Sequence, residues 1–146
     1  MSVKLGMQAK LYRNSGSYGT PTWVEVGNVK DLTLNLEAGE ADVTTRSNSG
    51  WRATVATLKD GSIEFEMVWD TTDANFTAIQ QGFFNNTPVE FAIMDGAIAT
   101  AGSQGLRATM SITNFSRSEA LEEAIMVSVT AKPTYAANAP SWMTIA

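Results

Sequence analysis

The chain has 146 residues, with 10 Lys and Arg against 15 Asp and Glu, and its net charge of −5 argues against general binding to nucleic acid or to anionic membranes. Cys and His are both absent, which excludes disulfides, thiol nucleophiles, Ser-His-Asp and Cys-His catalysis, and zinc sites built on these residues. The length suits one domain spanning residues 1–146, and no apolar stretch approaches the roughly 20 residues of a membrane-spanning helix.

Apolar and polar residues alternate along most of the chain, which is the pattern of β-strands with one face buried and the other facing solvent or a partner. The long alternating runs lie at residues 32–36, 51–55, 63–69, 106–112 and 125–129. Shorter strands are expected at residues 9–12, 22–26, 41–45 and 89–94. Many short strands at this spacing predict a mainly β fold, either a β-sandwich or a small β-barrel.

Turn-forming residues separate these runs. Asn48-Ser49-Gly50 and Lys59-Asp60-Gly61 are each predicted to form a hairpin turn, because Gly, Asn and Asp tolerate the backbone angles that tight turns require. The segment 37–51 leaves a strong strand and returns through the first of these turns. It is therefore expected to form an extended hairpin loop.

One segment, residues 72–85, breaks the alternation and predicts a helix. Its apolar residues fall at helical spacing: Phe76, Ile79, Phe83 and Phe84. Thr71 or Thr72 is expected to cap the N-terminus, with Asp73 in the first turn, and residues 85–88 end the helix. We expect this single helix to lie across an open face or end of the sheets.

Two acidic groups are candidates for chemistry. Glu37, Glu40 and Asp42 form one group, which is open to interpretation as an acid/base or divalent-cation site, although no calcium-loop spacing is present. Glu64 and Glu66 lie two residues apart on one predicted strand and so share a face, as the two catalytic carboxylates of a glycosidase can. A solvated or interface loop for the first group and a polar outer strand face for the second are the favoured interpretations, and neither requires catalysis. No complete catalytic, cofactor-binding or metal-binding set emerges, so the chain is not expected to be an enzyme.

A row of exposed tryptophans is one way to bind carbohydrate, and the chain has four tryptophans. Trp51 and Trp69 fall on the apolar sides of their strands, which favours positions in the core. Trp142 lies in an apolar, non-periodic C-terminal segment, residues 133–146, which is expected to form an arm that packs on something. A single β-sandwich module that binds carbohydrate or another ligand within a larger assembly remains the alternative hypothesis.

Several stretches together resemble the major tail tube proteins of long-tailed bacteriophages. The stretches are residues 37–46, 50–54 and 58–70 with the helical segment behind them, and Phe115-Ser116-Arg117, Leu121-Glu122-Glu123 and residues 127–133. The resemblance covers roughly residues 5–133. It implies a β-sandwich or small barrel with one flanking helix, shared with the tubes of contractile injection systems.

The resemblance also implies a function. Such proteins form hexameric rings that stack into a hollow tube in the virion tail, which conducts DNA without binding it specifically. The implied partners are further copies of the chain, a tape measure protein, a tail terminator, and baseplate or tip proteins. No cofactor and no membrane partner is implied, and assembly is expected in the host cytoplasm.

Three groups of residues are assigned to this assembly as hypotheses. Residues 37–51 are expected to reach the neighbouring ring, with polar contacts from the following side chains: Glu40, Asp42, Thr44 and Arg46. Acidic and small polar side chains are expected to line the lumen, because a basic wall would retain the phosphate backbone: Asp31, Thr33, Glu64 and Glu66. For these four residues the outer surface is the open alternative. Trp142 is expected to anchor the C-terminal arm, residues 133–146, in a neighbouring subunit.

Overall fold

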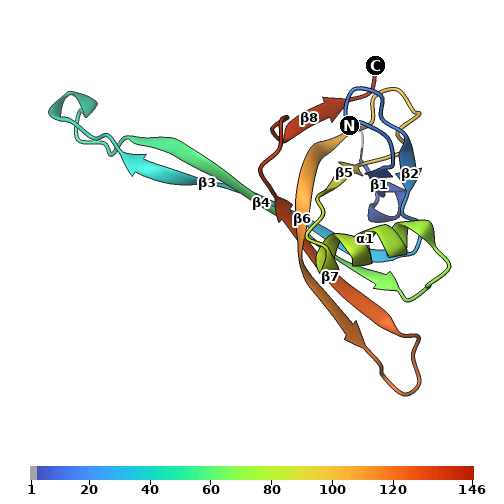
Figure 1. The fold of residues 1–146 in the computed structure, drawn as a ribbon. Helices are drawn as coiled ribbons and strands as arrows, with labels where there is room; N and C mark the ends of the chain where they lie inside the picture. The colour runs from blue at the N-terminus through green and yellow to red at the C-terminus, as the bar shows by residue number, and fades with distance from the viewer. Residues whose placement is uncertain (1–2) are drawn as a thin grey trace.

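Eight strands pair into one antiparallel sheet in the computed structural model, which describes residues 3–146 (Figure 1). The strands are β1 (Lys10–Asn14), β2 (Trp23–Glu25), β3 (Val29–Asp42), β4 (Thr54–Val68), β5 (Val89–Met94), β6 (Gln104–Ser118), β7 (Met126–Pro133) and β8 (Ser141–Thr144). Their order is β2-β1-β5-β6-β7-β4-β3, and β8 pairs with the start of β6. The helix α1 (Ala74–Phe84) and two short 3-10 helices, Gly6–Gln8 and Arg46–Asn48, complete the described elements.

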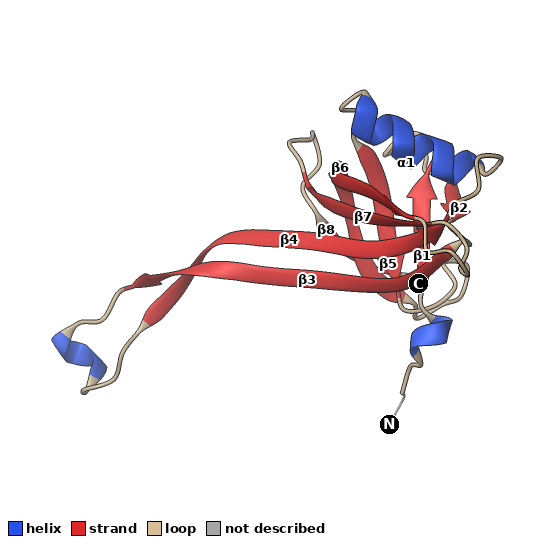
Figure 2. Cartoon of the chain, turned by 90° about the horizontal axis from the view of Figure 1, so that it is seen from below, coloured by secondary structure: helices blue, strands red, loops and turns tan. Residues whose placement is uncertain are grey.

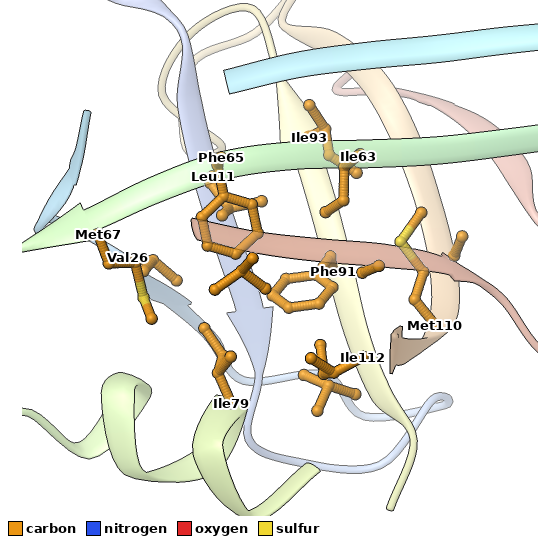
Figure 3. Packing of buried hydrophobic residues seen from close by; sticks show 14 of the residues in the cluster. Leu11, Val26, Ile63, Phe65, Met67, Ile79, Phe91, Ile93, Met110 and Ile112 are labelled. Carbon is orange, nitrogen blue, oxygen red and sulfur yellow. The ribbon is translucent and has the colours of Figure 1, made fainter. Parts of the chain in front are cut away.

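The prediction of a mainly β fold with one flanking helix is confirmed. The sheet curls around its apolar side without closing into a barrel, so that β1 and β5 face β4 and β7 in a sandwich-like arrangement (Figure 3). Leu11, Phe65 and Phe91 meet between these two halves, and the rings of Phe65 and Phe91 make an edge contact at 6.2 Å. The helix α1 packs against β6 and β5.

The helix begins one residue later than the sequence indicated. Asp73, and neither Thr71 nor Thr72, is the N-cap, and its side chain accepts a hydrogen bond from the backbone N–H of Asn75 at 3.0 Å. Thr72 instead donates its hydroxyl to Asp70. This change in capping follows from a tight turn that Asp70 and Thr72 form before the helix.

The apolar stripe of α1 is only partly buried. Phe76 and Ile79 are fully buried, whereas Phe84 is exposed. Trp69 is partly buried, as predicted, with its ring edge-on to Phe76 at 4.9 Å. The expected burial of Trp51 is wrong: 79% of its surface is exposed. Its alternation with Ala53 and Val55 is real, but this part of the chain has no core to pack against.

The second predicted turn is also wrong. Lys59, Asp60 and Gly61 lie inside β4, where they pair with Ala38, Glu37 and Leu36 of β3. A long ladder with the 14 residues of β3 supplies backbone hydrogen bonds that a turn at this point would break. The first predicted turn is confirmed, since Ser49 and Gly50 have positive φ angles of 54° and 82°.

The longer β3–β4 ladder produces a two-stranded arm that projects far from the rest of the protein (Figure 2). We define the arm as residues 36–60 and its tip as residues 43–53. β4 pairs with β7 only from Ile63 onward, so the arm has no third strand and no core. The predicted hairpin loop therefore exists, but it begins one residue earlier and ends nine residues later than position 51.

Candidate assembly surfaces

The four residues predicted to line a lumen lie together on one face of the sheet. Thr33 of β3 pairs with Glu64 of β4, and Asp31 and Glu66 occupy neighbouring positions on the same side of these strands. On the opposite side of the same strands, Leu32 and Phe65 pack in the core. Strand alternation thus separates a polar face from the core, as the sequence predicted.

This polar face continues across β7 and β6. Thr130 pairs with Glu64 and Ser128 with Glu66, and Asn114 of β6 pairs in turn with Thr130. A shallow hollow on this face is lined by side chains from all four strands: Asp31, Glu64, Glu66, Asn114, Ser128 and Thr130. The hollow contains three carboxylates and no cationic side chain, so its electrostatic potential is negative.

The four strands that form the polar face have unpaired edges on both sides. β3 is the last strand in the sheet order, so no strand within residues 3–146 pairs with its outer backbone groups. β5 covers β6 only up to Met110, which leaves residues 111–118 of β6 unpaired on that side. Unpaired strand edges of this length are templates for pairing with another chain.

The arm holds the four residues predicted to contact a neighbouring ring. Glu40 and Asp42 lie on β3, and Thr44 and Arg46 follow in the arm tip, all of them exposed. The Asp42 carboxylate accepts the backbone N–H of Thr44 at 2.9 Å and lies 3.8 Å from the guanidinium of Arg52. Hydrogen bonds from Thr44 hold the pKa of Asp42 below its usual range.

Side chains within the arm tip order its backbone. Thr44 Oγ1 accepts the N–H of Ala53 at 2.8 Å, across the two strands. Asn48 Oδ1 accepts the N–H of Thr45 at 2.7 Å and so closes the short 3-10 helix. The tip is therefore shaped in the isolated chain, before any partner binds, which lowers the entropy lost on docking.

Sequence reasoning missed the apolar residues of the arm. Leu36, Val43, Trp51, Val55 and Leu58 are all exposed on it. The predicted turn at residues 59–61 concealed them, because it divided the strand 54–68 and so hid the length of the arm. If residues 54–68 are taken as one strand, that strand and its partner extend beyond the rest of the sheet, and the apolar side chains on this extension have no core to pack against.

The C-terminal segment packs on its own chain through β8. Met143 and Ile145 pack against a small cluster of Tyr12, Ala92 and Met94. Trp142 leaves 59% of its surface exposed, while its indole N–H donates to Gln104 Oε1 at 3.1 Å. Burial of Met143 and Ile145 explains how the chain accommodates an apolar tail, and the indole ring remains accessible.

Two further features were sought among the described residues: metal-binding clusters and membrane-spanning helices. Within residues 3–146 no group of three or more carboxylates is arranged to hold a metal ion, and no helix is long and apolar enough to span a membrane. Trp51 and Trp142, both exposed, belong to the arm tip and to β8. Figure 1 shows these two segments far apart, so the two residues do not form a shared aromatic platform.

Comparison with solved structures identifies the fold. A chain from the virion of a native gene transfer agent particle aligns with a TM-score of 0.72 and 16% identity, covering 97% of this chain and 100% of the other. The SPP1 tail tube aligns with a TM-score of 0.70 and 16% identity, over 89% of this chain and 75% of that one. A chain of the six-fold symmetrised baseplate of the anti-feeding prophage aligns with a TM-score of 0.65 and 6% identity, over 99% and 98%.

Sequence comparison identifies the family. Curated protein sequences give no match. Residues 8–134, which include the arm, the polar face and α1, match the sequence profile of a family described as phage tail tube protein. The alternating strands, the single helix and the long hairpin are thus accounted for by one structural role, and the chain belongs to the phage tail tube protein family.

Proposed function

We propose that this protein is a structural tail tube subunit whose copies form hexameric rings, and that the rings stack into a hollow tube conducting DNA from virion to host cell. The observation that carries the proposal is a four-stranded sheet, β6-β7-β4-β3, with an acidic face, two unpaired edges and an arm at one end. A tail of a gene transfer agent particle with C6 symmetry, which aligns with a TM-score of 0.72 and 16% identity, supports the six-fold arrangement.

Ring closure uses the two unpaired edges. The outer edge of β3 in one copy pairs with residues 111–118 of β6 in the next copy, which satisfies the free backbone groups of both strands. The two edges are different surfaces of the chain, so the contact is heterologous and closes into a ring when the rotation per copy fits. The polar face of each copy then lines the inside of the ring.

An acidic lumen suits the passage of DNA. Asp31, Glu64 and Glu66 repel the phosphate backbone, whereas Lys or Arg at these positions would hold it by releasing its counterions. Hydroxyl and amide side chains fill most of the rest of this face, and its one cation on β7, Lys132, shares a small hollow with Glu37 and Asp60. Such a wall keeps DNA hydrated and free to slide.

The remaining contacts connect rings to each other and to the ends of the tube. The arm, including Glu40, Asp42, Thr44 and Arg46, reaches the adjacent ring. Trp142 of the C-terminal arm, residues 133–146, packs against a neighbouring copy. Tape measure, terminator and baseplate or tip proteins determine where the tube starts and stops, and assembly takes place in the host cytoplasm. The likeness to a chain of an anti-feeding prophage baseplate is consistent with a junction of this kind.

Electron microscopy of the purified protein tests the proposal. At high concentration, negative-stain images are expected to show rings with a central hole and stacked tubes of uniform width. A protein that remains monomeric at every concentration and ionic strength, and that no virion incorporates, would contradict it.

Cysteine cross-linking tests ring closure, because the natural chain has no Cys to interfere. Asn35→Cys on β3 is combined with Thr113→Cys or Ser116→Cys on β6. Oxidation of the double variants is expected to yield a ladder of oligomers up to the closed ring. Each single-Cys variant serves as the control, since it forms at most a disulfide-linked dimer.

A further inference from the structure

The arm tip and the β6–β7 turn lie at opposite ends of the same sheet. Asp42 pairs with Thr54 at the arm end of the β3–β4 ladder. At the other end of β4, Val68 pairs with Met126 of β7, which pairs in turn with Ser118 of β6. The turn between these last two strands, residues 119–125, therefore points away from the arm, and Figure 1 shows the two hairpins projecting in different directions.

These two ends have opposite charges. The arm tip contains Arg46 and Arg52 and no carboxylate, in a chain whose net charge is −5. The turn 119–125, which we call the acidic turn, contains Glu119, Glu122 and Glu123 and no cation. Concentrated charges of opposite sign at the two ends favour head-to-tail contact between copies and oppose contact between like ends.

Few of these charges are neutralised within the chain. The guanidinium of Arg52 lies 3.8 Å from Asp42, with 88% of the Arg52 side chain exposed. Glu119 pairs with Arg117 at 2.9 Å. Within residues 3–146, Arg46, Glu122 and Glu123 form no ion pair. The unpaired groups remain available to a partner.

Each end also exposes large apolar side chains among its charges. Trp51 of the arm tip is 79% exposed, and Leu121 of the acidic turn is fully exposed. A Trp surrounded by Arg is the composition of an interface hot spot. The arm tip is already ordered by its own hydrogen bonds, so docking costs little conformational entropy.

We propose that the arm tip of one copy docks on the acidic turn of a copy in the next ring, with Trp51 against Leu121 and Arg46 and Arg52 against the three glutamates. This docking rests on the proposed tube function and assigns a partner surface to the arm. Six residues of β3 from Glu37 to Asp42 extend the arm by about 20 Å beyond the sheet, at about 3.4 Å per residue, which spans a gap between rings. Because the two ends differ, every ring stacks in the same direction.

A charge-reversal set tests this pairing. Variant one is R46E/R52E, variant two is E122R/E123R, and variant three combines all four substitutions. Variants one and two are each expected to raise the critical concentration for tube formation by about tenfold or more, and variant three to restore it to within a few-fold of the natural protein. K4E/K10E changes the charge by the same amount as variant one, outside the arm and the acidic turn, and is expected to behave as the natural protein does.

Mixing the first two variants gives a sharper test. R46E/R52E presents acidic residues at both ends, and E122R/E123R presents basic residues at both ends. Neither is expected to form tubes alone at the natural critical concentration, whereas an equimolar mixture forms them, because each arm tip meets a turn of opposite charge. Sedimentation and negative-stain microscopy measure assembly, and circular dichroism confirms that each variant is folded.

The apolar part of the contact is tested separately. Trp51→Ala is expected to raise the critical concentration by about tenfold or more, while Trp51→Phe, which keeps an aromatic ring, has a smaller effect. Met7→Ala, which removes an apolar side chain that is 88% exposed and lies outside the arm and the acidic turn, is the control.

The outcomes distinguish the two proposals. Absence of tubes from the natural protein overturns the proposed function. Normal tubes from the natural protein and from R46E/R52E overturn the docking while leaving the tube function in place. If R46E/R52E forms no tubes, and neither variant three nor the mixture recovers them, the acidic turn is not the partner of the arm tip.

Discussion

Gly105 illustrates how one position controls strand pairing at the residue scale. It lies in β6 between Met94 of β5 and Met143 of β8. A Cβ atom at Gly105 would overlap the backbone of β5 at the carbonyl group of Ile93. Backbone cannot yield as a flexible side chain can, so only glycine permits β5 and β6 to approach this closely.

Replacing this glycine is expected to disrupt the sheet. Gly105→Ala should lower the free energy of unfolding by about 3 kcal/mol or more, measured by urea denaturation. Gly6→Ala, where no atom lies within 4 Å of the added Cβ, is the control and should change it by less than about 0.5 kcal/mol. Equal stability of the two variants would show that the strands adjust at this point.

A second feature at the residue scale is the carboxylate of Asp70, whose contribution to the stability of the folded chain depends on pH. Its carboxylate accepts hydrogen bonds from the hydroxyl of Thr72 at 2.6 Å and from its backbone N–H at 3.0 Å. These bonds lower the pKa of Asp70 below the usual 3.8, with the side-chain bond the larger cause. The charged form is thereby favoured in the folded chain, so the contribution to stability is full above pH 3.8 and is lost as pH falls through the lowered pKa.

Removing the hydroxyl is expected to reverse most of this shift. Thr72→Val should move the pKa of Asp70 upward toward its ordinary value, as measured by NMR titration of the carboxyl carbon. The pKa of Asp42, which depends on Thr44 instead, should stay lowered and serves as the internal control. An unchanged pKa for Asp70 would assign the shift to the backbone N–H alone.

At the element scale, the arm contributes little to the stability of the isolated chain. A two-stranded ribbon without a core is marginal by itself, and the arm has exposed side chains along almost its whole length. The pairing Glu37↔Asp60 marks where the arm leaves the sheet.

This separation predicts the result of removing the arm. Replacing residues 38–59 by Asn-Gly joins Glu37 to Asp60 through a two-residue type I′ turn. The free energy of unfolding should change by less than about 1 kcal/mol, because no core residue is lost. Tube formation should be abolished in negative-stain images, and normal tubes from this variant would contradict an inter-ring role for the arm.

At the scale of the whole molecule, one curled sheet separates the core from a polar face, and the proposed tube depends on where that face points. If it lines the lumen, Glu64 and Glu66 set the charge that DNA meets. An outward-facing polar face would leave DNA passage insensitive to these residues.

Charge reversal on this face is expected to slow DNA ejection without preventing assembly. E64K/E66K places cations where DNA passes, so ejection should slow by about tenfold or more at low salt and recover as salt is raised. E64D/E66D keeps the charge and should eject DNA at the natural rate. Ejection assays on virions with substituted tubes measure the effect, and equal rates for both variants would place the polar face outside the lumen.

Patterns in the sequence predicted the structure correctly wherever residues within a single strand or helix determined it. The alternation around Thr33 and Glu64 correctly predicted which side chains share a face, and the spacing of Phe76 and Ile79 correctly predicted a helix. The same alternation misplaced Trp51, because period two states that side chains share a face without stating whether anything covers it.

The sequence by itself determined strand faces, the helix and the tight turn at Ser49 and Gly50, because backbone geometry within a few residues controls them. Only the tertiary structure decided the strand order and the length of the arm. It also decided the ion pair between Glu90 of β5 and Arg107 of β6, two adjacent strands, in which the carboxylate and the guanidinium are 2.9 Å apart. These features depend on contacts between residues far apart in the chain. Competing local signals, such as Asp60-Gly61, are overruled when a longer ladder satisfies more backbone groups.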